Sequence, residues 1–69
     1  MNKITLREDY IKLGQALKAA HLVNSGVEAK IVITSGEVMV NGKIETQRGK
    51  KLVDGDVLSF QGETVTIIK

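Results

Sequence analysis

Apolar residues recur with two different periods along this 69-residue chain, and the change of period separates predicted helices from predicted strands. Near the start, Ile4 and Leu6 alternate with polar residues, which predicts a short N-terminal strand. The following apolar positions have helical spacing and predict a first helix that begins near residue 10: Tyr10, Leu13, Leu17 and Ala20. Asp9 stands where it would cap this helix. Gly14 inside it indicates either a close approach by another backbone or a tolerated glycine.

A second helix is predicted from Gly26 to Thr34, because signals for both of its ends are present. Ser25 followed by Glu28 has the pattern of a capping box, in which the serine hydroxyl accepts from the Glu28 amide and the glutamate side chain reaches back. Gly36 is suited to the left-handed residue that often follows a helix. The β-branched residues of this segment are also compatible with a strand, but the two end signals favour the helix.

From residue 38 onward the apolar period is two, which predicts strands. Val38 and Val40 precede Asn41-Gly42, a pair typical of a type I′ hairpin turn. A second turn is predicted at Asp54-Gly55, and two further strands are predicted over residues 57–60 and 64–68. The order is a short N-terminal strand, two helices and then a small antiparallel sheet. The predicted fold is therefore α+β, in a single domain that spans residues 1–69.

The composition is that of a globular protein, with 42% hydrophobic and 26% charged residues. The chain has no cysteine, which excludes a disulfide framework and a thiolate metal site. No apolar run approaches the roughly 20 residues of a membrane span. The N-terminal residues also lack the apolar core of a signal peptide. We therefore expect a cytoplasmic protein without a membrane partner.

Charge is distributed unevenly, although the formal net charge is only +2. Residues 11–26 contain basic residues but no Asp or Glu. Residues 43–51 contain four basic residues and one acidic residue, whereas residues 52–68 contain three acidic residues and no basic one. The distribution predicts a basic middle and an acidic flank. The alternative is that these charges are simply solvated.

The residues that carry chemistry favour binding over catalysis. His21 is the only histidine, no Ser-His-Asp arrangement is recognisable, and the Asp54-Gly55-Asp56 sequence is typical of a turn rather than a metal site. We therefore expect neither an enzyme nor a cofactor. The only aromatic residues, Tyr10 and Phe60, are both expected in the core. Without exposed aromatics for base stacking, a basic surface would recognise the backbone and shape of folded or double-stranded RNA.

Four segments resemble, in order and spacing, the S-four-type RNA-binding domain, which is also called the αL motif. They are K-L-G-Q-A-L from Lys12, S-G-V-E-A-K-I-V-I from Ser25, S-G-E-V-M-V-N-G from Ser35 and D-G-D-V-L from Asp54. The resemblance extends from about Lys12 to Phe60, and the compact length is similar to that of the small stand-alone bacterial members. It implies one RNA-facing surface formed by the two helices and the loop that follows the hairpin.

The resemblance, together with the basic middle, predicts RNA contacts at eight residues: Lys12, Lys18, Ser25, Lys30, Lys43, Arg48, Lys50 and Lys51. Two positions depart from the family pattern, since Gly26 stands where many members have Arg and Gly14 where many have Asp. The first departure removes a phosphate contact, so we expect binding to rest more on Arg48, Lys50 and Lys51. The implied partner is ribosomal or transfer RNA, with a ribosomal subunit as a candidate, bound by a monomer.

A small β-grasp-like module for protein interaction, without RNA binding, is the alternative hypothesis. Its sulfur-carrier form is disfavoured, because carriers end in a flexible Gly-Gly tail and this chain ends in a strand-like T-V-T-I-I-K. A plain docking form would use Val27 and Ile31, on the side of the second helix away from Ala29 and Ile33. Packing of Val27 and Ile31 beneath the N-terminal strand is the favoured interpretation of these two residues.

Overall fold

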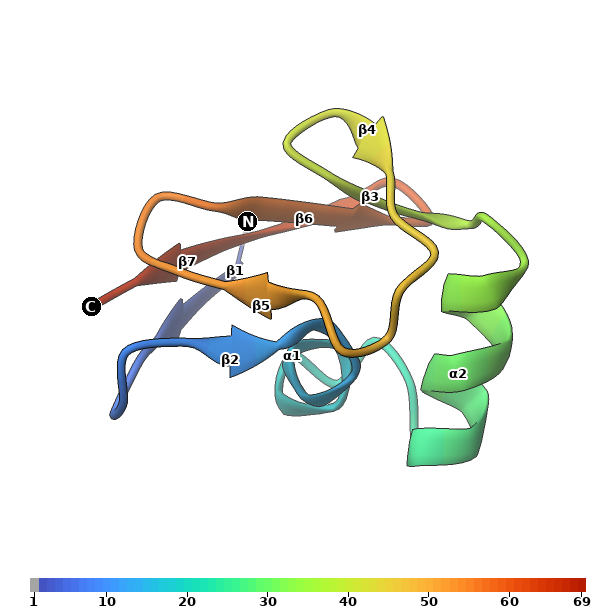
Figure 1. Cartoon of the computed structure of the whole chain (residues 1–69), viewed down its shortest axis with the longest axis horizontal. Helices are drawn as coiled ribbons and strands as arrows, with labels where there is room; N and C mark the ends of the chain where they lie inside the picture. Colours follow the sequence, from blue (N-terminus) through green and yellow to red (C-terminus); the bar gives the residue numbers. More distant parts are fainter. Residues whose placement is uncertain (1) are drawn as a thin grey trace.

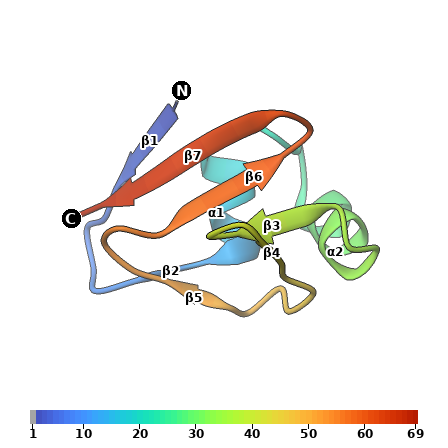
Figure 2. The ribbon, with the colours of Figure 1, turned by 90° about the horizontal axis from the view of Figure 1, so that it is seen from above.

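The structure is a computed structural model that describes residues 2–69. Its elements, in chain order, are β1 (Asn2–Thr5), β2 (Ile11–Lys12), α1 (Leu13–Ala19), α2 (Gly26–Thr34), β3 (Val38–Val40), β4 (Lys43–Ile44), β5 (Lys51–Leu52), β6 (Val57–Phe60) and β7 (Glu63–Ile68). Helix α1 packs against one face of the main sheet, and α2 lies beside α1, near β3 (Figures 1 and 2). Neither of these short helices is long and apolar enough to cross a membrane.

The main sheet has five strands in the order β1-β7-β6-β3-β4. Within this sheet, β3 pairs antiparallel with β4 and β6, and β6 pairs antiparallel with β7, as the sequence predicts. Strand β1 pairs in parallel with β7, from Asn2 opposite Val65 to Thr5 opposite Ile68, so the sheet as a whole is mixed. The α+β class, the N-terminal strand and the two helices are confirmed.

The predicted start of the first helix is wrong, because Ile11 and Lys12 are extended and pair with Leu52 and Lys51 in a two-stranded ribbon. This ribbon of β2 and β5 lies beside α1, and β2 leads directly into the helix (Figure 1). Lys12 is the N-cap residue of α1 and makes no side-chain cap. Asp9 therefore does not cap the helix, and its carboxylate pairs instead with the Lys69 ammonium at 2.7 Å.

Both predicted ends of α2 are confirmed. The Ser25 hydroxyl accepts a hydrogen bond from the Glu28 amide at 3.1 Å, and the Glu28 carboxylate accepts one from the Asn24 amide at 2.6 Å. Beyond the other end, Gly36 has a φ of +82°, and its amide donates to the Ile33 carbonyl at 3.1 Å. Capping therefore comes from residues next to the helix, which is why the sequence pattern identified it.

The Asn41-Gly42 turn is also confirmed, with positive φ angles of 53° and 82° as type I′ geometry requires. The Asn41 side chain has a further structural role. Its amide nitrogen donates to the Asp56 carboxylate at 3.0 Å, and its oxygen accepts from the Val57 amide at 2.9 Å. Asn41 therefore connects the hairpin turn to the turn that precedes β6.

A single core joins the helices to the sheet. Its fully buried large side chains are Leu13, Leu17, Ile33, Val38, Leu52, Leu58, Val65 and Ile67. Val27 and Ile31 do not join this core, since they are 70% and 59% exposed. Their predicted packing beneath the N-terminal strand is wrong, because β1 pairs with β7 in the main sheet and α2 buries its other face, which carries Ala29 and Ile33.

Candidate functional site

The loop between β4 and β5, residues 45–50, is held against the start of α1. The Leu13 amide donates to the Lys50 carbonyl at 2.8 Å, and the Gly14 amide donates to the Arg48 carbonyl at 3.2 Å. The first amides of a helix have no acceptor within the helix, so these two bonds cap α1. The backbone of the basic loop is thereby fixed beside the helix.

Gly14 allows this contact. A Cβ atom at Gly14 would lie 2.9 Å from Cγ of Arg48, which is closer than real Cβ contacts. Of the two interpretations of this glycine, the close approach by another part of the chain is therefore the correct one. Any side chain at this position, Asp included, would require Arg48 to move.

A hollow of about 290 Å³ opens between α1, the N-terminus of α2 and the 45–50 loop. Lys12, Lys18 and Arg48 line it, together with Gly26, and none of the residues that line it is acidic. We call this hollow the basic groove. The first-turn amides of α2 add partial positive charge, because the N-terminal amides of a helix point outward and favour anions. Ser25, the N-cap of α2, directly precedes Gly26 in the chain but does not itself line the groove.

The remaining predicted contact residues do not join the basic groove. Lys43 and Lys50 line a separate hollow of about 430 Å³ together with Glu45 and Asp56, whose carboxylates reduce its attraction for phosphate. Lys30 is exposed on α2. The structure thus brings together three of the predicted basic residues and separates four others, including Lys51.

Tyr10 was predicted in the core, and this prediction is wrong because its side chain is 40% exposed. The residue lies outside α1, directly before β2, so it does not share the helical face of Leu13 and Leu17. The Lys51 ammonium lies 4.8 Å from the centroid of the Tyr10 ring, within the range of a cation–π contact. Phe60, the other aromatic residue, is buried as predicted.

Sequence reasoning missed two residues near the groove. Gln15 lines it from α1, and Gly49 lines it from the loop. Neither residue type carries a signal for nucleic-acid binding by itself. Their positions follow from the contact between the loop and α1, which no local pattern indicates.

The acidic turn has a structural role. The Asp54 carboxylate accepts from the Lys69 amide at 2.9 Å, and the Asp56 carboxylate accepts from the Val53 amide at 2.8 Å. His21 is exposed in the turn after α1, with a φ of 60°. Within residues 2–69, no three His, Cys, Asp or Glu side chains are grouped so that they could hold a metal ion.

Comparison with known proteins relates this geometry to a family. The model of the S4 domain matches residues 4–68. A relative from Bacillus subtilis (strain 168), named "Probable ribosome maturation protein RlbA", is 41% identical over 61 residues, which are 88% of this chain and 86% of that protein. YbcJ of Escherichia coli (strain K12) is 36% identical over 62 residues, or 90% of this chain and 89% of that protein.

The fold has a solved counterpart. The solution structure of YbcJ from E. coli, described as an αL motif involved in RNA binding, superposes with a TM-score of 0.77 at 34% sequence identity. The match covers 100% of this chain and 89% of the YbcJ chain. The resemblance to the αL motif stated from the sequence is therefore confirmed.

Proposed function

This chain belongs to the S4 domain family, and from that premise we propose that it binds structured ribosomal or transfer RNA in the basic groove. The observation that carries the proposal is the grouping of Lys12, Lys18 and Arg48 around the N-terminus of α2, without an acidic residue in the lining. Three cations and a helix N-terminus together favour phosphate groups.

In this proposal, the three cations contact phosphates on one stretch of folded RNA, and Ser25 and the first amides of α2 contact a neighbouring phosphate. Such contacts read the shape of the RNA backbone rather than its base sequence. Gly26 has open space around its Cβ position, so no side chain there shields these amides. The absence of the Arg that many family members carry is in this way offset by closer access to the helix N-terminus.

The other predicted contacts are then peripheral. Lys30, Lys43, Lys50 and Lys51 strengthen attraction to the RNA from around the groove, and Arg48 contributes more than Lys50 and Lys51. This order differs from the expectation drawn from the sequence. It is supported by the carboxylates of Glu45 and Asp56 in the hollow that contains Lys43 and Lys50.

The cellular role that we propose is binding without catalysis, by a cytoplasmic monomer, on a ribosomal subunit during its maturation. The name of the B. subtilis relative supports the ribosomal partner. The matched family and the solved relative are described by a domain type and by RNA binding, and not by a reaction. The β-grasp-like alternative has less support, because the fold matches the αL structure.

Charge reversal tests the groove. We expect the triple variant Lys12→Glu, Lys18→Glu, Arg48→Glu to lose binding to 16S and 23S ribosomal RNA fragments and to transfer RNA, because each reversal turns a phosphate contact into a repulsion. Binding is measured by fluorescence anisotropy, and folding is checked by circular dichroism.

The matched control is Lys30→Glu, Lys43→Glu, Lys50→Glu, which changes the net charge by the same amount outside the groove. This control should weaken RNA binding much less than the triple variant in the groove does. Equal losses in the two triple variants would show that net charge, rather than the basic groove, governs RNA binding.

A further inference from the structure

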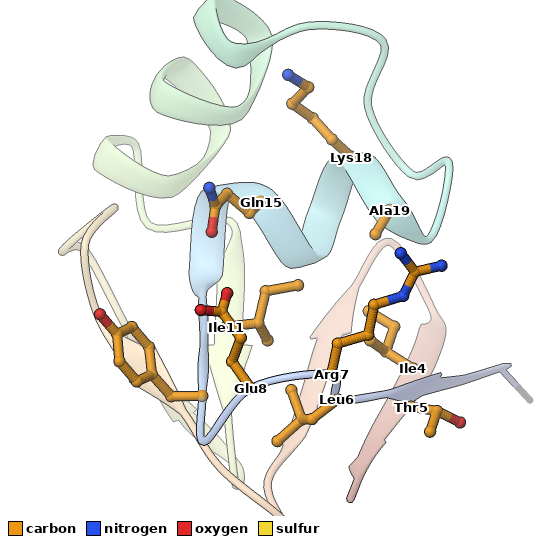
Figure 3. Close-up of a pocket in the computed structure, with 10 residues that line it drawn as sticks. Ile4, Thr5, Leu6, Arg7, Glu8, Ile11, Gln15, Lys18 and Ala19 are labelled. Carbon is orange, nitrogen blue, oxygen red and sulfur yellow. The ribbon is translucent and has the colours of Figure 1, made fainter.

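A second hollow, of about 400 Å³, lies between α1 and the segment that connects β1 to β2 (Figure 3). Its volume lies in the range of about 300–1,000 Å³ that is typical of small-ligand sites. Gln15 and Lys18 of α1 line both this hollow and the basic groove, so the two hollows are adjacent along α1. We call it the α1 hollow.

The α1 hollow combines an apolar floor with polar side chains. The buried Leu6 and the half-buried Ile4 and Ile11 form the apolar part, and Ala19 adds to it from α1. Five exposed polar residues also line it: Thr5, Arg7, Glu8, Gln15 and Lys18 (Figure 3). The 40% exposed Tyr10 belongs to the lining as well. An apolar hollow with a few polar groups fits a flat, partly polar ligand better than an ion.

The charges around the α1 hollow differ from those of the groove. Apart from Lys18, the hollow has one acidic side chain, Glu8, and one basic side chain, Arg7, whereas the charged side chains of the groove are all cations. The Glu8 carboxylate can accept a hydrogen bond from the exocyclic amino group of a base. The Gln15 amide can both donate and accept. Figure 3 shows the Lys18 side chain extending away from the hollow toward α2, which leaves its ammonium for the groove.

Tyr10 supplies the remaining requirement, an aromatic ring accessible to a ligand. The Lys51 ammonium lies 4.8 Å from the centroid of this ring, and Lys51 belongs to β5 of the two-stranded ribbon. Stacking of a base on an accessible aromatic ring is a common mode of single-strand recognition.

We propose that the α1 hollow receives one unpaired nucleobase of the RNA whose phosphates lie in the basic groove. This inference rests on the proposed function. The protein then reads two features at once: the backbone of a folded segment in the groove, and an extruded base in the hollow, with Tyr10 as the stacking surface and Glu8 and Gln15 facing the base edge.

Three RNAs test this inference. The first is a blunt duplex of about 16 base pairs, the second has one unpaired cytidine as a bulge, and the third has an abasic residue in the bulge. The abasic bulge has the same backbone and flexibility without the base. We expect the wild type to bind all three, and the cytidine bulge about 5- to 150-fold more tightly than the abasic one, which is the range for one stacked base.

Three variants test whether the preference for the cytidine bulge over the abasic bulge arises in the α1 hollow. Tyr10→Ala should abolish the preference for the cytidine bulge and leave binding to the blunt duplex unchanged. Tyr10→Phe is the matched control and should keep the preference, because it retains the ring. Glu8→Gln should reduce the preference for the cytidine bulge. Because Glu8 is exposed, this substitution should leave the fold intact, so it tests the hollow even if Tyr10→Ala is unstable.

The outcomes separate the two proposals. Equal binding of the cytidine and abasic bulges by the wild type would overturn the base site and leave the basic groove intact. A preference that survives in both Tyr10→Ala and Glu8→Gln would also overturn it. Failure of the wild type to bind any of the three RNAs would overturn the proposed function itself, and the base site with it.

Discussion

At the scale of single residues, Gly14 determines how closely the basic loop approaches α1. The Gly14 amide donates a hydrogen bond to the Arg48 carbonyl, and the lack of a Cβ atom leaves room for the Arg48 side chain. Gly14 is the second residue of α1, so it costs less than the roughly 1 kcal/mol that glycine costs relative to alanine in a helix interior. The contact with Arg48 gives a structural reason for glycine at this position. Through this contact, Gly14 influences where the Arg48 side chain lies in the basic groove.

Gly14→Ala should weaken RNA binding by several fold. The new methyl group would lie 2.9 Å from Cγ of Arg48, so that side chain must move away from the groove. The gain in helix propensity, which is below the roughly 1 kcal/mol of an interior position because Gly14 lies in the first turn, partly offsets the crowding. We expect the free energy of unfolding to change by less than about 1 kcal/mol. RNA titration and urea unfolding measure the two effects.

The control for Gly14→Ala is Gly49→Ala, in the same groove, where an added Cβ meets no atom within 4 Å. It should leave RNA affinity nearly unchanged. If both variants bind equally well, the close approach at Gly14 has no bearing on Arg48.

At the scale of elements, α2 begins and ends on its own local signals, whereas α1 depends on a distant loop. Ser25 and Glu28 cap the first turn of α2 from within the segment. The carbonyl groups of Arg48 and Lys50 cap α1 instead. The two helices therefore respond differently to substitution: the cap of α2 can be altered without touching the loop.

Ser25 has both a capping role and a proposed RNA contact, and two substitutions separate them. Ser25→Ala should lower the free energy of unfolding by about 1 kcal/mol, because the Glu28 amide loses its acceptor. Ser25→Asp should keep the stability, since aspartate also caps helices, but should weaken RNA binding because a carboxylate then directly precedes Gly26, which lines the groove.

Chemical unfolding and RNA titration of both Ser25 variants check this prediction. If Ser25→Asp binds RNA as tightly as the wild type, Ser25 lies away from the phosphates and acts only as a cap.

At the scale of the whole molecule, the spatial grouping of charges matters more than the net charge of +2. Three cations surround the basic groove, while the lysines of a neighbouring hollow face carboxylates. The apolar faces of two short helices and a five-stranded sheet form the core. A domain of this size has one core layer, so binding takes place on its surface.

The salt dependence of RNA binding measures how many phosphates are contacted. Each contact contributes about 0.7–0.9 to the slope of log affinity against log salt concentration. For the three groove cations we expect a slope of about −2 to −3, measured between low and physiological salt. A slope near −6 would mean that all seven predicted basic side chains bind phosphates, which would contradict the central role of the groove.

Much of the fold and part of the candidate site follow from the sequence. The αL resemblance, the N-terminal strand, the two helices and the Asn41-Gly42 turn agreed with the structure, whereas the β2–β5 ribbon was not predicted. Lys12, Lys18 and Arg48 were among the predicted contacts. Tyr10 was assigned to the core because it fitted the helical spacing of Leu13 and Leu17. Periodicity alone does not show where a helix begins when the cap comes from another segment.

The sequence by itself determined α2 and its ends, because Ser25, Glu28 and Gly36 act on backbone groups within a few residues. For the same reason it determined the hairpin at Asn41-Gly42. Only the tertiary structure decided the start of α1, the exposure of Tyr10 and the grouping of the cations. These features depend on the pairing of β2 with β5 and on hydrogen bonds from the first amides of α1 to carbonyls of the 45–50 loop. Both contacts join segments that are far apart in the chain, so no local pattern encodes them.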